Sequence, residues 1–205
     1  MKKIISLVFI MMIGFSANLY ADKNKKIKRI SEGDESAKIT IITYESLTCG
    51  HCADFHKNVY PNLKKDFIDK GLVKIEFRHF PLDIAAFNAS KIGQCNNDGK
   101  SGVLHALFSG QKKWAKGKSP EEAKAYLKKF LIEENINLDF EKCLADKDIE
   151  DFVLNDRIEG VKKFKVNSTP TIIIDDKKFD KALNYKNLKK SNLMDLNHSL
   201  KKQTF

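Results

Sequence analysis

The sequence lacks the features that mark nucleic-acid-binding, multidomain and repeat proteins. Its 205 residues carry 37 Lys and Arg against 27 Asp and Glu, a formal net charge of +10. Arginine is scarce, the lysines are scattered, and no basic run is interleaved with aromatic residues, so we expect no nucleic-acid partner. No internal repeat and no Gly/Ser-rich linker divides a chain whose length suits one domain.

The first 21 residues have the pattern of a signal peptide. Lys2 and Lys3 form a positive start, the apolar segment 4–15 follows, and small residues end at Ala21, after which we expect cleavage. The apolar segment is short for a bilayer span of about 20 residues, and no later segment is apolar enough to span a membrane. We therefore expect export to the periplasm, with an uncleaved N-terminal anchor as the alternative.

Cysteine is also sparse, with four residues in the whole chain: Cys49, Cys52, Cys95 and Cys143. An even number of cysteines in an oxidising compartment is compatible with two disulfides. A domain of this size buries enough core to fold without a metal or disulfide framework. Any disulfide is therefore expected to be functional or accessory rather than the sole support of the fold.

Runs of β-branched residues predict core strands at residues 38–44 and 171–175, and partial alternation of apolar and charged residues predicts another at 72–78. We expect residues 22–37 to form an exposed lead-in. After the third strand, the sequence predicts a turn at 176–178 and a brief edge strand from Phe179.

Helical spacing of apolar residues predicts a helix over 52–68, which Pro61 should kink or divide. From Asp83 to Phe164 the whole segment is predicted to be helical, and Ser119-Pro120-Glu121-Glu122 is a helix-start pattern. The remaining predicted helices are 84–95, 103–114, 139–145, 147–164 and 187–202. Strands at both ends of a helical block predict an α/β core with a helical insertion.

Cys49-Gly50-His51-Cys52 follows directly after the first predicted strand, at the start of a helix. The unpaired N–H groups and partial positive charge of a helix N-terminus favour a thiolate, which lowers the pKa of Cys49. Cys52, one turn later and less exposed, can attack a mixed disulfide formed at Cys49. A hydrogen bond from His51 to the thiolate would make the disulfide more oxidising.

Two other interpretations of the cysteine pair stay open at the sequence level. A zinc site takes four ligands, and Cys95 and Cys143 lack nearby cysteine partners. An exported copper-binding module could combine the two thiolates with a distant histidine such as His56, His79 or His105. A structural disulfide across so short a loop would stabilise the fold little. We expect thiol chemistry, no bound metal and no organic cofactor.

Three ordered motifs resemble the DsbA-like branch of the thioredoxin-fold disulfide oxidoreductases. They are the sequences Cys49-Gly50-His51-Cys52, Arg78-His79-Phe80-Pro81-Leu82 and Val166-Asn167-Ser168-Thr169-Pro170-Thr171. The resemblance implies a thioredoxin-like fold formed by residues 22–82 and 165–205, with the helical insertion at 83–164. It implies a cis Thr169–Pro170 bond beside the active-site cysteines. It also implies a second disulfide, between Cys95 and Cys143, with two buried free thiols as the alternative.

Two departures from the family pattern concern the direction and the proton chemistry of the reaction. Gly-His between the cysteines is typical of protein disulfide isomerases, whereas Pro-His is common in bacterial DsbA proteins. The family often carries an acid six or four residues before the first cysteine, where this chain has Thr43 and Glu45. Glu45 either assists proton transfer from Cys52 or points to solvent. His79 and Trp114 are expected to be structural.

The expected activity is that of a protein dithiol oxidase acting on unfolded or reduced exported proteins. The resemblance implies that a quinone-linked membrane reoxidase of the DsbB type restores the Cys49–Cys52 disulfide. A disulfide isomerase or reductase of the same fold is the alternative. Residues 22–37 leave little room for the N-terminal dimerisation domain of DsbC-type isomerases, so we expect a monomer.

Overall fold

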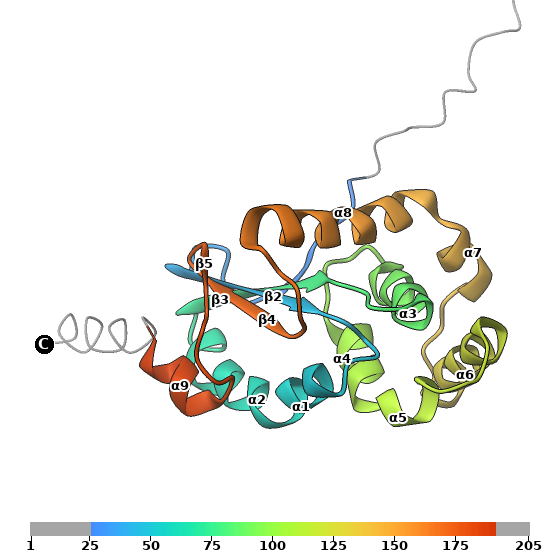
Figure 1. The fold of residues 1–205 in the computed structure, drawn as a ribbon, viewed down its shortest axis with the longest axis horizontal. Helices are drawn as coiled ribbons and strands as arrows, with labels where there is room; N and C mark the ends of the chain where they lie inside the picture. Colours follow the sequence, from blue (N-terminus) through green and yellow to red (C-terminus); the bar gives the residue numbers. More distant parts are fainter. Residues whose placement is uncertain (1–25, 192–205) are drawn as a thin grey trace, which may run out of the picture.

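The computed structural model describes residues 26–191, and within them the chain forms a mixed sheet of five strands (Figure 1). The strands are β1 (Ile30–Glu32), β2 (Ile39–Glu45), β3 (Val73–His79), β4 (Thr171–Ile174) and β5 (Lys177–Lys178). Their order across the sheet is β1-β3-β2-β4-β5. The central strands β2 and β3 are parallel, and the other neighbouring pairs are antiparallel.

The central position of β2 explains its composition. It pairs with β3 through Ile41 and Ile75 and with β4 through Ile42 and Ile173, so both of its edges are paired, and consecutive residues that point to opposite faces are buried. A strand buried on both faces is expected to be a near-continuous run of β-branched residues rather than an alternating one. In β3, by contrast, buried and half-buried residues alternate. Both strands match the sequence prediction to within one residue.

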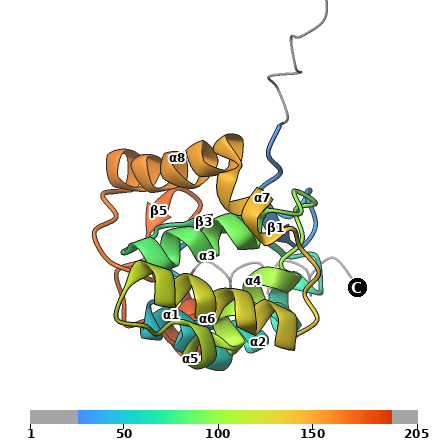
Figure 2. The same cartoon turned by 90° about the vertical axis from the view of Figure 1, so that its right-hand side faces the viewer.

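Helices cover both faces of the sheet and extend beyond one end of it (Figure 1). They are α1 (Gly50–Asn58), α2 (Tyr60–Leu63), the π-helical turn η1 (Lys64–Ile68), α3 (Ile84–Gln94), α4 (Gly102–Ser109), α5 (Gln111–Trp114), α6 (Pro120–Glu133), α7 (Phe140–Ala145), α8 (Lys147–Phe164) and α9 (Tyr185–Lys190). α1, α2 and α9 lie on one face, and α8 lies on the other. The helices α3–α8 all lie between β3 and β4 in the chain, and together they are called the helical segment. Figure 2 shows α3 and α6 side on, beneath α8.

Several local predictions are confirmed for reasons that are visible in the backbone. Pro61 divides the predicted long helix, because α1 ends at Asn58 and a new helix begins at Tyr60. The Ser119 side chain accepts a hydrogen bond from the Glu122 N–H and caps α6, whose first residue is proline. The Trp114 side chain is fully buried in the core.

Two predictions around the sheet are wrong. The segment 22–37 is not simply an exposed lead-in, because β1 lies within it and pairs with β3, leaving Ile30 only 1% exposed. The predicted turn at 176–178 comes one residue earlier. Asp175 and Asp176 take the left-handed conformation, with φ of 47° and 62°, and close a two-residue hairpin that places Lys177 in β5.

The predictions for the chain ends lie partly outside the described residues. The signal peptide falls within residues 1–25, and most of the predicted helix 187–202 falls beyond Ser191. Within the described residues, the helix that corresponds to this prediction is α9, which ends at Lys190. Among residues 26–191, no helix combines the length and the apolar character needed to cross a membrane.

Candidate active site

Cys49 is the N-cap residue of α1 and has an extended backbone, with φ of −78° and ψ of 119°. Its carbonyl accepts the first hydrogen bonds of the helix, from the N–H groups of Cys52 at 3.1 Å and Ala53 at 3.2 Å. The Cys49 side chain is half-buried, whereas Cys52 is 0% exposed. One thiol therefore faces the surface at the start of a helix, and the other lies directly behind it.

The surroundings of Cys49 favour its thiolate. A hydrogen bond from the Cys52 thiol, together with the backbone N–H groups of Cys52 and His51, lowers the pKa of Cys49 to about 5, although partial burial opposes the shift. Cys49 is therefore ionised at neutral pH. A stabilised thiolate is a stable reduced state and a good leaving group.

The surroundings of Cys52 act in the opposite direction. Burial raises the pKa of the Cys52 thiol far above its usual value, and the hydrogen bond to Cys49 and the charge of Glu45 raise it further. Cys52 therefore holds its proton while Cys49 does not. This asymmetry assigns the accessible, reactive sulfur to Cys49 and the protected sulfur to Cys52.

The chain entering β4 lies against Cys49. The Thr169–Pro170 peptide bond is cis, as the family resemblance implied. The Sγ atom of Cys49 lies 3.4 Å from the carbonyl oxygen of Thr169, so residues 120 positions apart meet at the reactive sulfur. Thr171 then pairs with Tyr44 of β2, which fixes the position of this turn relative to the strand that leads to the cysteines.

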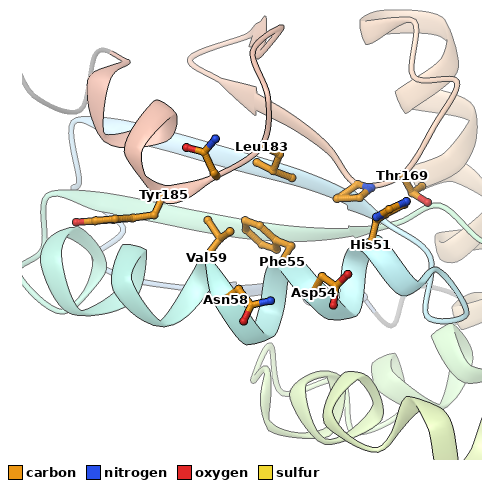
Figure 3. Close-up of a pocket in the computed structure, with 10 residues that line it drawn as sticks. His51, Asp54, Phe55, Asn58, Val59, Thr169, Leu183 and Tyr185 are labelled. Carbon is orange, nitrogen blue, oxygen red and sulfur yellow. The ribbon is translucent and has the colours of Figure 1, made fainter.

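An open groove of about 570 Å³ begins beside this turn and runs along α1 towards α9 (Figure 3). Its walls come from α1 and Val59 directly after it, the cis-proline turn, and the segment 183–185 at the start of α9. The lining residues are His51, Asp54, Phe55, Asn58, Val59, Thr169, Pro170, Leu183, Asn184 and Tyr185. The groove combines apolar and hydrogen-bonding side chains, and its form suits an extended peptide more than a small enclosed ligand.

The backbone of His51 stabilises the Cys49 thiolate, whereas the sequence predicted that its side chain would do so. Its backbone N–H stabilises Cys49, while its side chain is exposed and lines the groove beside Thr169 (Figure 3). Within residues 26–191, the His51 imidazole makes no hydrogen bond to Cys49. The side chain is therefore placed to contact whatever occupies the groove.

Glu45, the last residue of β2, is buried rather than pointed at solvent. Its Oε2 atom lies 2.9 Å from Nε2 of His56, and its Oε1 atom has no hydrogen-bond partner in the described part of the chain. The Glu45 charge acts on Cys52, as the raised pKa of that thiol indicates. Thr43, at the other position where the family carries acids, is also fully buried.

Gln111 in α5 contacts the active-site loop and was not among the sequence candidates. Its buried Nε2 group donates to the carbonyl of Leu47 at 2.8 Å and to that of Cys49 at 3.0 Å. Both carbonyls lie where β2 gives way to α1. No local pattern marks this glutamine, because its partners are more than 60 residues away in sequence.

The remaining cysteines lie within the helical segment. Cys95, at the end of α3, forms a disulfide with Cys143 of α7, with the Cα atoms 5.4 Å apart. Cys49 and Cys52 are both free thiols. Among residues 26–191, no group of three or more His, Cys, Asp and Glu side chains is arranged to hold a metal ion.

A half-buried thiol of low pKa at a helix start, a buried second thiol and a cis-proline turn on a mixed sheet define a thioredoxin-like thiol–disulfide site. Sequence comparison agrees with this class. The family model described as "Thioredoxin" matches residues 25–191, and the chain belongs to that family. Its fold is thioredoxin-like.

The names of individual relatives refer to disulfide chemistry. The structure of alpha-DsbA1 from Wolbachia pipientis matches with a TM-score of 0.72 at 29% identity, covering 85% of this chain and 94% of that one. The disulfide bond formation protein D of Bacillus subtilis is 25% identical over 171 residues, covering 78% of this chain and 73% of the relative. A Rickettsia bellii protein named as a protein-disulfide oxidoreductase is 26% identical over 146 residues, covering 69% of this chain. This chain spans only 55% of the Rickettsia relative's length.

Proposed function

We propose that this protein is an exported dithiol oxidase that introduces disulfides into periplasmic proteins by exchange at Cys49 and Cys52. The observation that carries the proposal is the opposite shift of the two thiols: the pKa of Cys49 falls to about 5, and that of Cys52 rises. A thiolate stabilised in the reduced enzyme makes the Cys49–Cys52 disulfide a stronger oxidant. The disulfide chemistry of the relatives supports the same activity.

The reaction begins with the Cys49–Cys52 disulfide. A substrate thiolate attacks Sγ of Cys49, a substrate–Cys49 disulfide forms, and Cys52 leaves with the electron pair of the broken bond. A second substrate thiolate then attacks the substrate sulfur of this mixed disulfide. The substrate leaves with a new disulfide, and Cys49 leaves as a thiolate. The substrate is oxidised by two electrons, and the enzyme is reduced by two.

The groove beside Cys49 supports an unfolded or reduced exported protein as the substrate. Thr169 and Pro170 lie at its end next to the reactive sulfur, and Asp54 and Asn58 supply hydrogen-bonding groups along α1 (Figure 3). An extended chain can lie along such a groove without a folded recognition surface, whereas a folded partner would need a complementary one.

The cycle also needs an electron acceptor, since each turnover leaves two electrons on the enzyme. We propose a quinone-linked membrane reoxidase of the DsbB type, which would act on Cys49 from the periplasmic side. The leader pattern at residues 1–21 supports this location. The thiol chemistry needs no metal and no organic cofactor, and we propose that the protein acts as a monomer.

The equilibrium of the Cys49–Cys52 pair with reduced and oxidised glutathione tests the proposal. We expect the dithiol form to persist at glutathione ratios that keep an ordinary protein disulfide closed. A strongly reducing pair would contradict the oxidase assignment and favour a reductase or isomerase. A Cys49→Ser variant should lose all exchange, and tight stoichiometric metal on the reduced wild type without exchange activity would favour the metal-binding alternative.

A further inference from the structure

A chain of four titratable side chains runs from beneath the active site towards the surface. Oε2 of Glu45 lies 2.9 Å from Nε2 of His56, and Nδ1 of His56 lies 3.1 Å from Nδ1 of His105. Nε2 of His105 lies 2.7 Å from Oε1 of Glu32. The four residues come from β2, α1, α4 and β1, so the chain forms only when the sheet, the active-site helix and the helical segment pack together.

Exposure increases from Glu45 through His56 to His105. The Glu45 and His56 side chains are 3% and 6% exposed, whereas that of His105 is 28% exposed. The ring of Phe108 stacks on His56 with the centroids 4.0 Å apart, and the ring of Tyr60 packs against both histidines. Water therefore reaches the outer histidine, while the inner histidine and Glu45 are enclosed.

The charges around Glu32 determine which atom donates in the hydrogen bond between His105 and Glu32. Burial opposes ionisation of Glu32, but hydrogen bonds from His105 and Ser101 and the ammonium group of Lys64 hold its pKa well below the usual range. Glu32 is therefore a carboxylate and can only accept, so Nε2 of His105 carries a proton.

The contact between the two histidines holds a single proton. Nδ1 of His56 and Nδ1 of His105 face each other, so one must donate and the other accept. With the proton on His105, Nε2 of His56 donates to ionised Glu45. When the proton moves to Nδ1 of His56, the proton on Nε2 passes to Glu45, and the total charge of the three groups is unchanged.

We propose that His56 and His105 form a proton relay that links water to buried Glu45 and, through it, to Cys52. The proposal rests on the proposed thiol exchange, in which Cys52 must gain and lose a proton without contact with water. When a substrate thiolate attacks Cys49, Cys52 leaves with the electron pair of the disulfide and takes the proton of Glu45. His56 then passes the proton of His105 inward to Glu45. During reoxidation the same steps run in reverse.

The test separates the two steps by which oxidised glutathione closes the reduced enzyme. First, the Cys49 thiolate attacks glutathione disulfide, forming a mixed disulfide and releasing one glutathione thiolate. Second, Cys52 gives its proton to Glu45 and attacks Cys49, releasing the second glutathione thiolate. Acid quenching followed by mass spectrometry gives both rates as a function of pH, because the mixed disulfide adds the mass of one glutathione.

The His105→Gln variant should leave the first step unchanged and slow the second. General acid–base groups contribute about 10²–10⁴-fold to rate, so we expect at least about tenfold slower closure at neutral pH from loss of this outer member. The pH profile of the closure rate should also differ from that of the wild type, because a group that carries protons has been removed. In a His105→Ala variant, free imidazole in the buffer should restore part of the rate.

Phe108→Leu is the matched control, because it removes the ring stacked on His56 without removing a group that carries protons. It should close with the wild-type pH profile. Wild-type closure in His105→Gln, or an equal loss in Phe108→Leu, would overturn the relay. A wild-type protein that glutathione disulfide fails to convert to the Cys49–Cys52 disulfide at all would instead overturn the proposed function. Should His105→Gln fail to fold, the closure rate of the His105→Ala protein is compared with and without imidazole. If imidazole does not raise that rate, the relay is overturned.

Discussion

Removing the Cys52 sulfur should raise the pKa of Cys49. The hydrogen bond from the Cys52 thiol is the largest influence on Cys49, whose pKa in the wild type is about 5. A Cys52→Ala variant loses this donor and keeps the backbone N–H groups at the start of α1. A Cys52→Ser variant keeps a buried hydroxyl that can donate in place of the thiol. The two variants should therefore titrate differently.

The size of the difference follows from the strength of one hydrogen bond to a charged sulfur. Hydrogen bonds to charged groups contribute about 1.5–3 kcal/mol, and one pKa unit corresponds to about 1.4 kcal/mol. The pKa of Cys49 should therefore rise by about one to two units in Cys52→Ala, to about 6–7. In Cys52→Ser it should stay near the wild-type value of about 5.

The ultraviolet absorbance of the thiolate, recorded against pH and checked by the rate of iodoacetamide alkylation, measures these values. Cys49→Ser gives the blank. Equal titration of the Ala and Ser variants would refute the role given to the Cys52 thiol, and a wild-type pKa near that of a free cysteine would refute the whole electrostatic account.

The same titration sets the sign of a stability change with pH in the reduced protein. The pKa of Cys49 is lower in the folded state, at about 5, than in an unfolded chain, at about 8.5. The contribution of Cys49 to folding stability is therefore largest above about pH 8.5, declines as the pH falls and is lost below about 5. Denaturant unfolding of the reduced and oxidised forms at several pH values should show the decline in the reduced form, where Cys49 titrates.

Three further substitutions test the framework around the site. Gln111→Leu removes two hydrogen bonds from backbone carbonyls at the active-site loop, and denaturant unfolding should show a loss of about 1–3 kcal/mol; an unchanged midpoint would contradict this. A Cβ atom at Gly110 would lie 2.1 Å from the Phe130 ring, so Gly110→Ala should cost about 1–3 kcal/mol by overpacking, visible as a lower Tm than the wild type. Replacing Cys95 and Cys143 together by Ala opens a loop with a sequence separation of 48 and should destabilise the fold by up to about 4 kcal/mol, while glutathione exchange at the active site continues.

Local sequence patterns were sufficient for the elements that contain most of their own signal. β2 is a largely β-branched run, β3 alternates apolar and charged residues, and α6 carries its own cap in Ser119. β1 has only three residues in a charged segment, and it is a strand because β3 offers it an open edge. Pairing of that kind depends on a partner more than 40 residues away, so the short segment alone does not reveal it.

The residues of the candidate site also fall into those that a local motif reveals and those that only the packing reveals. The thiol pair and the cis-proline turn are recognisable because each is a contiguous motif, and the family resemblance links them. Glu45 was ambiguous because a strand residue can face either side, and the answer came from the packing of His56 against it. Gln111 and His105 carry no motif. Their functional candidacy comes entirely from where the helical segment places them.

The helical segment therefore does more than extend a thioredoxin-like core. α5 brings Gln111 to the carbonyl of Cys49, and α4 brings His105 to the histidine that holds Glu45. The first contact fixes the backbone that presents the reactive thiol, and the second gives the buried acid a path to water. The pKa of Cys49 is lowered by groups of α1 and by Thr169 of the cis-proline turn, so the thioredoxin-like core alone accounts for an accessible thiolate. Proton exchange at the enclosed Cys52 is the part of the chemistry that needs the helices inserted between β3 and β4.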